Sequence, residues 1–445
     1  MASGSKRAAA LIAKLRAKSS ASRDEVIGEL VKIGAAAVPA LGKALDNKDY
    51  KVRMAAAEAL GDIGDEKAIP PLIEALSDSS KNTQAAAAEA LAEIGDAAVP
   101  ALLDALIGSD QSARKWAAEA LGSIGDTSVA QQLMNRLNDQ NVEVQRAAVT
   151  ALGDLKSKRA IEPLILVLSS DNVDLAKAAA EALGKIRSPV AIEPLIGALS
   201  SSSVDVRRAA SDSLAAVGSR SVPKLMEAIE AGDSVVRRWG VEILGQIGDK
   251  RAQNLLLTCL EDGDERVVRY AAVALGGLGS EASIRHLAPL LRHDNKDIRY
   301  AAVEGLAGTK SAKAVKHVAG CLSDEDWVVR LTCACALGEI GSRTCVDPLL
   351  RALKDKEWSV RRHAAIGLGR IGVKKRSVPV LIKALGDPKE LVRSAAAEAL
   401  GELGAEEAVE HLRELLRDDD AKVVAAAEQA LVALGAMPEA AAAVG

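Results

Sequence analysis

Apolar residues recur along the chain at intervals of three and four, the spacing that places them on one face of an α-helix. Residues 52–63 show this arrangement clearly. The stripe that includes Leu60 is expected to face a partner helix, while the small Ala59 leaves room for a further helix at close range. The outward positions of this segment are Met54, Glu58 and Asp62.

One phrase, Leu-Gly-x-Ile-Gly, recurs in full or degenerate form along almost the whole chain. Its leading leucines lie 30 to 32 residues apart, a period typical of stacked two-helix repeats. Two helices of about eleven residues cannot bury both of their faces alone, so neighbouring repeats must stack. The thirteen leading leucines are Leu60, Leu91, Leu121, Leu152, Leu183, Leu214, Leu244, Leu275, Leu306, Leu337, Leu368, Leu400 and Leu431.

Each repeat carries signals for the ends of its two helices. In most repeats a proline opens the first helix, where its missing N–H costs no hydrogen bond. A turn aspartate such as Asp78 follows and is expected to cap the second helix. The second helix opens with Val-Arg, as at Val52-Arg53 and Val268-Arg269, and ends at a glycine suited to a left-handed C-cap. Because partly buried charges need partners, the arginines and turn aspartates are expected to form a charge ladder between adjacent repeats.

These signals predict an all-α protein, an α-solenoid wound as a right-handed superhelix of about thirteen two-helix repeats of 30–32 residues. We expect an N-terminal helical cap at 1–34, the solenoid at 35–435 and a frayed C-terminal tail at 436–445.

The repeat resembles the short HEAT-like repeats of the phycobilisome-lyase type. The segment from Asp347-Pro348 to Arg361-Arg362 matches that pattern closely, and the resemblance covers residues 35–435. The family contains bilin lyase subunits, phycobilisome-degradation factors, deoxyhypusine hydroxylase and scaffolds. The resemblance therefore implies an architecture and selects no single activity.

Composition narrows the class of protein. Phe is absent and aromatic residues make up 2% of the chain, which suits thin helices and disfavours one large core. The net charge of −4 argues against a dedicated nucleic-acid binder. No apolar stretch approaches the roughly 18 residues that span a bilayer. The five cysteines, an odd number, favour a reducing compartment, and we expect a cytoplasmic protein. Residues 1–23 are basic, as in a transit peptide, but the apolar stripe of Leu11, Ile12 and Leu15 better suits a helix that caps the first repeat.

The positions of the His, Gly and Cys residues argue against several kinds of catalytic or binding site. None of the five histidines precedes a glutamate, which rules out the iron-binding dyads of deoxyhypusine hydroxylase. Residues 367–372 spell GxGxxG, but they close a helix and no strand precedes them. Cys333 and Cys335 suggest a thiolate pair, yet positions two apart on a helix point to different faces. We therefore expect no catalytic residues, no cofactor and no metal site.

One outward column differs from the rest of the surface, because it changes from basic to aromatic and aliphatic residues along the stack. Exposed Tyr, Trp and Arg are typical of interface hot spots. Alternatively, the tryptophans fill gaps between repeats and the bases pair with glutamates one turn away. The candidate partner-binding residues are Lys115, Trp116, Arg146, Lys177, Arg208, Arg238, Trp239, Tyr270, Tyr300, Leu331 and Arg362.

Our first hypothesis is a non-enzymatic scaffold or adaptor that binds a protein partner, an acidic or mixed-charge segment, on its concave helix face. It involves no nucleic acid and no membrane. The family resemblance implies an alternative, a bilin lyase or lyase subunit. DNA binding in the manner of the HEAT-like alkylpurine glycosylases is a third hypothesis, disfavoured because aromatic residues are scarce.

Overall fold

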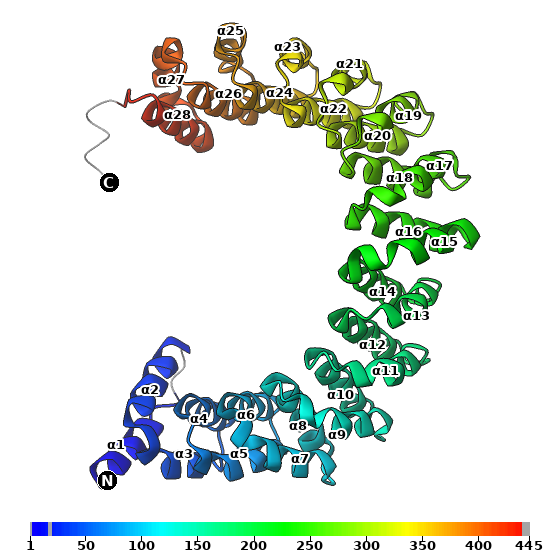
Figure 1. The fold of residues 1–445 in the computed structure, drawn as a ribbon. Helices are drawn as coiled ribbons and strands as arrows, with labels where there is room; N and C mark the ends of the chain where they lie inside the picture. The colour runs from blue at the N-terminus through cyan, green and yellow to red at the C-terminus, as the bar shows by residue number, and fades with distance from the viewer. Residues whose placement is uncertain (1, 17–19, 438–445) are drawn as a thin grey trace. The chain divides into compact units, whose positions relative to one another are not determined.

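The computed structural model describes residues 2–16 and 20–437; most of the expected tail, residues 438–445, lies outside the described residues. Throughout the described part the chain forms α-helices and short 3-10 turns, without a strand. The predicted all-α solenoid is confirmed. After α1 and α2, these residues form thirteen helical hairpins, from α3/α4 to α27/α28 (Figure 1).

The chain divides into two compact units, Met1–Lys224 and Leu225–Gly445, with the boundary inside α15 (Val222–Ala231). In each unit the even-numbered helices form an inner layer and the odd-numbered helices an outer layer (Figure 1). The helices of the first unit are α1 (Ala2–Ile12), α2 (Ser20–Ile33), α3 (Val38–Ala44), α4 (Tyr50–Ile63), α5 (Ile69–Ala75), α6 (Lys81–Ile94), α7 (Val99–Ile107), α8 (Gln111–Ile124), α9 (Ala130–Asn135), α10 (Val142–Asp154), α11 (Ile161–Leu168), α12 (Val173–Ile186), α13 (Ile192–Ala198) and α14 (Val204–Val217).

The second unit continues the same alternation. Its helices after α15 are α16 (Ser234–Ile247), α17 (Gln253–Thr258), α18 (Glu265–Gly277), α19 (Ile284–Leu290), α20 (Lys296–Gly308), α21 (Val315–Gly320), α22 (Trp327–Ile340), α23 (Val346–Ala352), α24 (Trp358–Ile371), α25 (Lys374–Ala384), α26 (Glu390–Glu402), α27 (Val409–Glu414) and α28 (Ala421–Ala433).

Most outer helices are shorter than the eleven or so residues expected from the sequence, although α15 has ten residues and α25 has eleven. Helix α9 has only six, because the 3-10 turns Thr127–Val129 and Arg136–Asn138 take both of its ends. Short 3-10 pieces are common at helix termini. The outer helices therefore present narrow ridges, while the inner helices, with 13 or 14 residues in most repeats, form the longer surface.

Glycine in the recurring phrase lets adjacent inner helices approach closely. A Cβ on Gly122 of α8 would lie 2.8 Å from the Cα of Ala151 on α10, closer than any side chain tolerates. The second glycine of the phrase has a different role: Gly125 ends α8 with a φ of +85°, where glycine avoids the steric cost of the left-handed region. Backbone geometry therefore explains why both positions are occupied by glycine.

Most turn aspartates lie two residues before the N-cap residue of the inner helix, so the predicted capping role is wrong for them. Asp262 accepts a hydrogen bond from the backbone N–H of Asp264 at 2.8 Å. Asp264 is the N-cap residue of α18, and its side chain accepts from the N–H of Arg266. Two successive carboxylates therefore order this turn, and both oxygens of the first also accept hydrogen bonds from Arg237 of the preceding repeat.

The predicted charge ladder is confirmed. Arg53 donates from Nε and Nη2 to the two oxygens of Asp78 at 2.7 and 2.8 Å, and from Nη1 to the carbonyl of Asn47 in its own turn. Bidentate pairs of this kind add geometric specificity. Each such pair clamps one inner helix to the turn of the next repeat. The other rungs are Arg114–Asp139, Arg237–Asp262, Arg299–Asp324, Arg330–Asp355, Arg361–Asp387 and Arg393–Asp418.

Six of the ladder aspartates have a lowered pKa. Burial acts to raise the pKa of Asp78, but the hydrogen bonds from Arg53 and Ser80 outweigh it, and the pKa is lowered. In five further rungs the hydrogen bond from the arginine likewise helps to lower the pKa of the aspartate. We call these six residues the low-pKa ladder aspartates. They are Asp78, Asp139, Asp262, Asp355, Asp387 and Asp418.

Some repeats lack the ladder arginine. Gln145 takes its place in α10 and donates from Nε2 to the carbonyl of Asp139 in its own turn at 2.6 Å. Gln84 makes the equivalent bond to Asp78 in α6. These repeats keep the bond to their own turn without a buried charge.

None of the helices in the described ranges is long and apolar enough to cross a membrane.

Candidate functional site

The candidate column lies on the inner helices of both units. In the first unit Lys115, Arg146, Lys177 and Arg208 follow one another on α8, α10, α12 and α14. Lys115 and Arg146 are partly buried, whereas Lys177 and Arg208 are exposed. The column in the second unit starts at Arg238 on α16 and passes through Tyr300, Leu331 and Arg362 on α20, α22 and α24.

Helix α18 corrects the predicted register of this column. Arg269, rather than Tyr270, lies six residues before the leading leucine Leu275, the spacing that separates Arg238 from Leu244. The Val-Arg phrase misled the prediction because Val268 occupies the ladder position, and it is buried there. Tyr270 instead shares the column of Trp116 and Trp239, one position further along.

Each residue of this aromatic column lies beside the base that precedes it. The Nζ of Lys115 is 4.2 Å from the ring centroid of Trp116. The guanidinium carbon of Arg238 lies 5.5 Å from the ring of Trp239, and that of Arg269 lies 5.1 Å from the ring of Tyr270. A cation at this range is attracted by the ring quadrupole. We call these three base–aromatic neighbours the cation–aromatic pairs.

Trp116 is held in place by the preceding repeat. Its Nε1 donates to Oε1 of Gln84 at 2.8 Å, so the indole bridges α8 to α6. It also lines an open cleft of about 420 Å³, whose walls include Glu89 and Glu119. Burial raises the pKa of Glu119. Trp116 therefore fills a gap between repeats and presents part of its ring to the surface.

Trp239 differs from Trp116 in its polar atom, because its Nε1 is buried and has no hydrogen-bond partner among the described residues. The residue beside it is Gly240, where a Cβ would lie 2.6 Å from Ile229 on α15. In the next repeat but one, the hydroxyl of Tyr300 donates to Glu304 at 2.7 Å, which raises the pKa of Tyr300 to about 12. Tyr300 is thus a neutral, half-buried member of the column.

Several bases of the column have acidic partners, in agreement with the alternative drawn from the sequence. Lys115 lies 3.7 Å from Glu119, and Lys177 lies 3.9 Å from Glu181, one turn along each helix. Arg146 bonds Glu143 on the preceding turn at 2.6 Å instead. Exposed pairs of this type contribute roughly 0.2–0.5 kcal/mol. They leave these side chains free to exchange partners at little cost.

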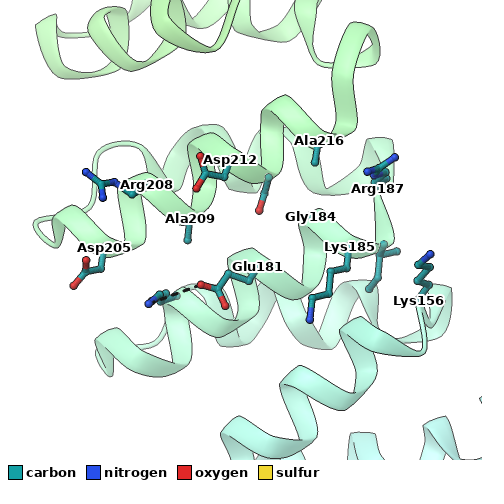
Figure 2. A pocket seen from close by; sticks show the side chains of 13 residues that line it. Lys156, Glu181, Gly184, Lys185, Arg187, Asp205, Arg208, Ala209, Asp212 and Ala216 are labelled. Atoms are coloured by element: carbon teal, nitrogen blue, oxygen red, sulfur yellow. Dashed lines mark ion pairs between the residues drawn. The ribbon is translucent and has the colours of Figure 1, made fainter. Parts of the chain in front are cut away.

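An open cleft of about 770 Å³ lies in the first unit and includes Lys177 and Arg208 of the predicted column (Figure 2). Sequence reasoning missed the rest of its charged lining. The available signal was the loss of the closing glycine in two adjacent copies of the repeat phrase. The other charged residues of the lining are Lys156, Glu181, Lys185, Arg187, Asp205 and Asp212.

Metal-binding side chains and thiols are the remaining candidate chemistry of the chain. No group of three or more His, Cys, Asp or Glu side chains that could hold a metal ion occurs in the described ranges. All five cysteines are free thiols. Burial raises the pKa of both Cys259 and Cys335 to about 11, so these two thiols stay protonated at neutral pH.

Comparison with known proteins agrees with the fold. Yeast importin-beta (Kap95p) superposes with a TM-score of 0.59 at 16% identity, over 96% of this chain and 70% of that one. The Kap95:Nup1 complex gives 0.62 at 16% identity over the same shares. Kap121p bound to Ste12p gives 0.60 at 15% identity, over 96% of this chain and 52% of that one. At these identities the likeness concerns the fold alone.

No curated protein matches the chain in sequence. The family of HEAT repeats matches it at residues 8–80, 69–141, 130–215, 192–276, 222–307, 284–366 and 346–432. Because these matches together cover most of the sequence, the chain belongs to the HEAT-repeat family.

Proposed function

We propose that this protein is a non-enzymatic scaffold that binds a protein partner through the inner helices. The observation that carries the proposal is the three cation–aromatic pairs. The chain contains only four tryptophans and three tyrosines, and three of these seven lie half-exposed beside a base on the inner layer. Trp, Tyr and Arg are the residue types enriched in interface hot spots.

The second unit provides the stronger candidate surface. Arg238 with Trp239 and Arg269 with Tyr270 repeat the same arrangement on two neighbouring inner helices, α16 and α18, which pack directly together. A rigid aromatic ring beside a mobile base offers both apolar area and a charged hydrogen-bond donor. Similar solenoids hold protein partners, as in the Kap95:Nup1 complex, which supports this class of function.

A protein partner fits the charges better than nucleic acid does. The chain carries 57 Lys and Arg against 61 Asp and Glu, and glutamates alternate with the bases on the inner layer. A phosphate backbone requires a continuous basic surface. We propose a soluble partner in a reducing, cytoplasmic compartment, consistent with the five free cysteines.

The repeat phrase supports a second proposal, a bilin lyase or lyase subunit, through its resemblance to the phycobilisome-lyase type of HEAT-like repeat. Incubation of the purified protein with free bilin distinguishes the two. A shifted and enhanced visible absorbance that co-elutes with the protein would favour bilin handling, whereas an unchanged bilin spectrum would favour the scaffold.

The scaffold proposal is tested by affinity capture with wild type, the Arg238→Glu/Arg269→Glu variant and the Tyr270→Ala variant. Captured proteins are identified by mass spectrometry and then purified for titration. We expect a partner whose affinity falls at least about tenfold in the charge-reversal variant, since hot-spot losses of this size are usual. Trp327→Ala is the matched control, because Trp327 is 46% exposed but lies outside the column. Equal affinity for all variants would refute the inner surface of the second unit as the site.

A further inference from the structure

Two adjacent repeats place a basic residue where the fold favours glycine. Ten of the thirteen repeats close the inner helix with a glycine of positive φ. Lys156 and Arg187 take this position with φ values of +48° and +55°. A non-glycine residue rarely adopts this conformation, because its Cβ crowds the backbone. Such outliers cluster at functional sites.

Packing gives no reason for a side chain at this position. In the flanking repeats the equivalent glycines are Gly125 and Gly218, and an added Cβ would meet no atom within 4 Å at either of them. A side chain here therefore extends from an open part of the surface. What distinguishes Lys156 and Arg187 from the glycine of other repeats is their charge.

The two charges converge on one feature. Lys156 follows α10 and Arg187 follows α12, and both line the 770 Å³ cleft of the first unit. Figure 2 shows them with Lys185 at one end of the cleft, while Arg208 lies toward the other end. Because consecutive repeats supply these residues, the fold itself aligns the charges along the inner layer.

Three of these cations have no internal counter-ion. Lys185 bonds Asp154 at 2.6 Å, and Lys177 lies 3.9 Å from Glu181. Within the described part of the chain, the side chains of Lys156, Arg187 and Arg208 lie within 4.0 Å of no carboxylate oxygen and form no ion pair. The cleft thus offers three positive groups that an incoming anion can pair with.

We propose that this cleft binds an extended acidic segment of the partner protein, with carboxylates against Lys156, Arg187 and Arg208. The proposal rests on the scaffold function for the class of partner, but it uses residues of the first unit only. The carboxylates of Glu181, Asp205 and Asp212 also line the cleft, as Figure 2 shows. They oppose a uniform polyanion such as a nucleic acid, whereas a peptide can place its acids opposite the bases alone.

The test uses the full chain and a fluorescein-labelled hexaglutamate peptide, followed by fluorescence anisotropy at low and moderate salt. The variant Lys156→Gly/Arg187→Gly installs the residue that most repeats carry, so its unfolding midpoint should equal or exceed that of wild type. We expect the affinity for hexaglutamate to fall about tenfold, as two exposed ion pairs are lost. Added salt should weaken wild-type binding.

Lys310→Gly is the matched control. Lys310 has the same left-handed conformation, with a φ of +50°, but it lies in the second unit and does not line this cleft. The control should leave the affinity for hexaglutamate unchanged. A loss of affinity in the control as large as in the double variant would mean a non-local charge effect and would overturn the proposal.

Two further outcomes would also overturn it. One is the absence of an effect on hexaglutamate binding: either the wild-type protein does not bind the peptide, or the double variant binds it with the same affinity as wild type. The other is an oligothymidylate of six nucleotides that binds more tightly than hexaglutamate and is lost in the same variant, which would assign the cleft to a phosphate backbone. Failure here leaves the capture by the second unit unaffected, so the scaffold proposal and the cleft proposal can fail separately.

Discussion

Removing the aspartate from one rung of the ladder should destabilise the solenoid strongly, because it leaves a buried arginine without its counter-ion. The rung formed by Arg330 and Asp355 is well suited to the test. Its side chains are only 5% and 10% exposed, and its two parallel bonds measure 2.8 and 3.0 Å. The rung clamps α22 to the turn before α24.

The substitution Asp355→Ser isolates the ion pair from the turn. Asp355 also accepts the backbone N–H of Glu357 at 2.8 Å, but serine can replace that bond, as Ser170 does when its hydroxyl accepts from Asn172 at 3.2 Å. Breaking a buried pair on one side costs about 3–5 kcal/mol. Arg330 keeps its Nη1 bond to the carbonyl of Asp324 at 2.9 Å, so we expect a loss near about 3 kcal/mol.

A second substitution should restore much of this loss. Arg330→Gln with Asp355→Ser reproduces the pair that the chain already uses in the first unit, where Gln145 is followed 25 residues later by Ser170. Gln145 donates to a carbonyl of its own turn without a buried charge. We therefore expect the double variant to be more stable than Asp355→Ser alone by about 1–2 kcal/mol, a coupling typical of residues in contact.

Native-state hydrogen exchange of the α22 and α24 amides is the appropriate assay, since repeat arrays can unfold in segments rather than in one step. Exchange in the first-unit helices is the internal control and should not change. The reasoning is refuted if Asp355→Ser lowers protection in α22 and α24 by less than about 1 kcal/mol, or if the double variant is less stable than the single one.

Three further predictions follow from the fold. The low-pKa ladder aspartates have folded pKa values below their unfolded value of about 3.9, so the stability they contribute is present above that pH and is lost as the pH falls below it. The urea midpoint should accordingly drop between about pH 5 and pH 3, and a flat profile would contradict the ladder's role. Gly122→Ala should cost about 1–3 kcal/mol, because its Cβ meets backbone of α10; Gly197→Ala, where an added Cβ meets nothing within 4 Å, should be neutral or stabilising in the same thermal scan. Cys335, whose pKa burial raises to about 11, should alkylate with iodoacetamide at pH 7 far more slowly than after unfolding in urea, and equal rates would show that the thiol is accessible and ionisable.

Features of the fold that repeat along the chain could be predicted from the sequence. A close contact between Gly122 and Ala151 recurs in other repeats with the same spacing, so thirteen copies of one phrase determine thirteen similar helix pairs. The ladder was predictable for the same reason, because complementary charges 25 or 26 residues apart recur in several repeats. The exact cap residue was not, since Asp262 and Asp264 are chemically identical and only the backbone geometry distinguishes their roles.

The candidate site depends on departures from the repeat, and these are harder to detect. In α18 the phrase Val268-Arg269 has the sequence of a ladder position, but it lies one residue closer to the leading leucine than in other repeats. Only the spacing of six residues to Leu275 shows that Arg269 belongs to the surface column. Lys156 and Arg187 looked like degenerate copies of a helix-closing glycine. Their meaning emerges when the stacking of α10 and α12 brings both charges to one cleft. In a repeat protein the conserved geometry builds the scaffold, so positions that break the pattern without a packing reason are the ones to test for binding.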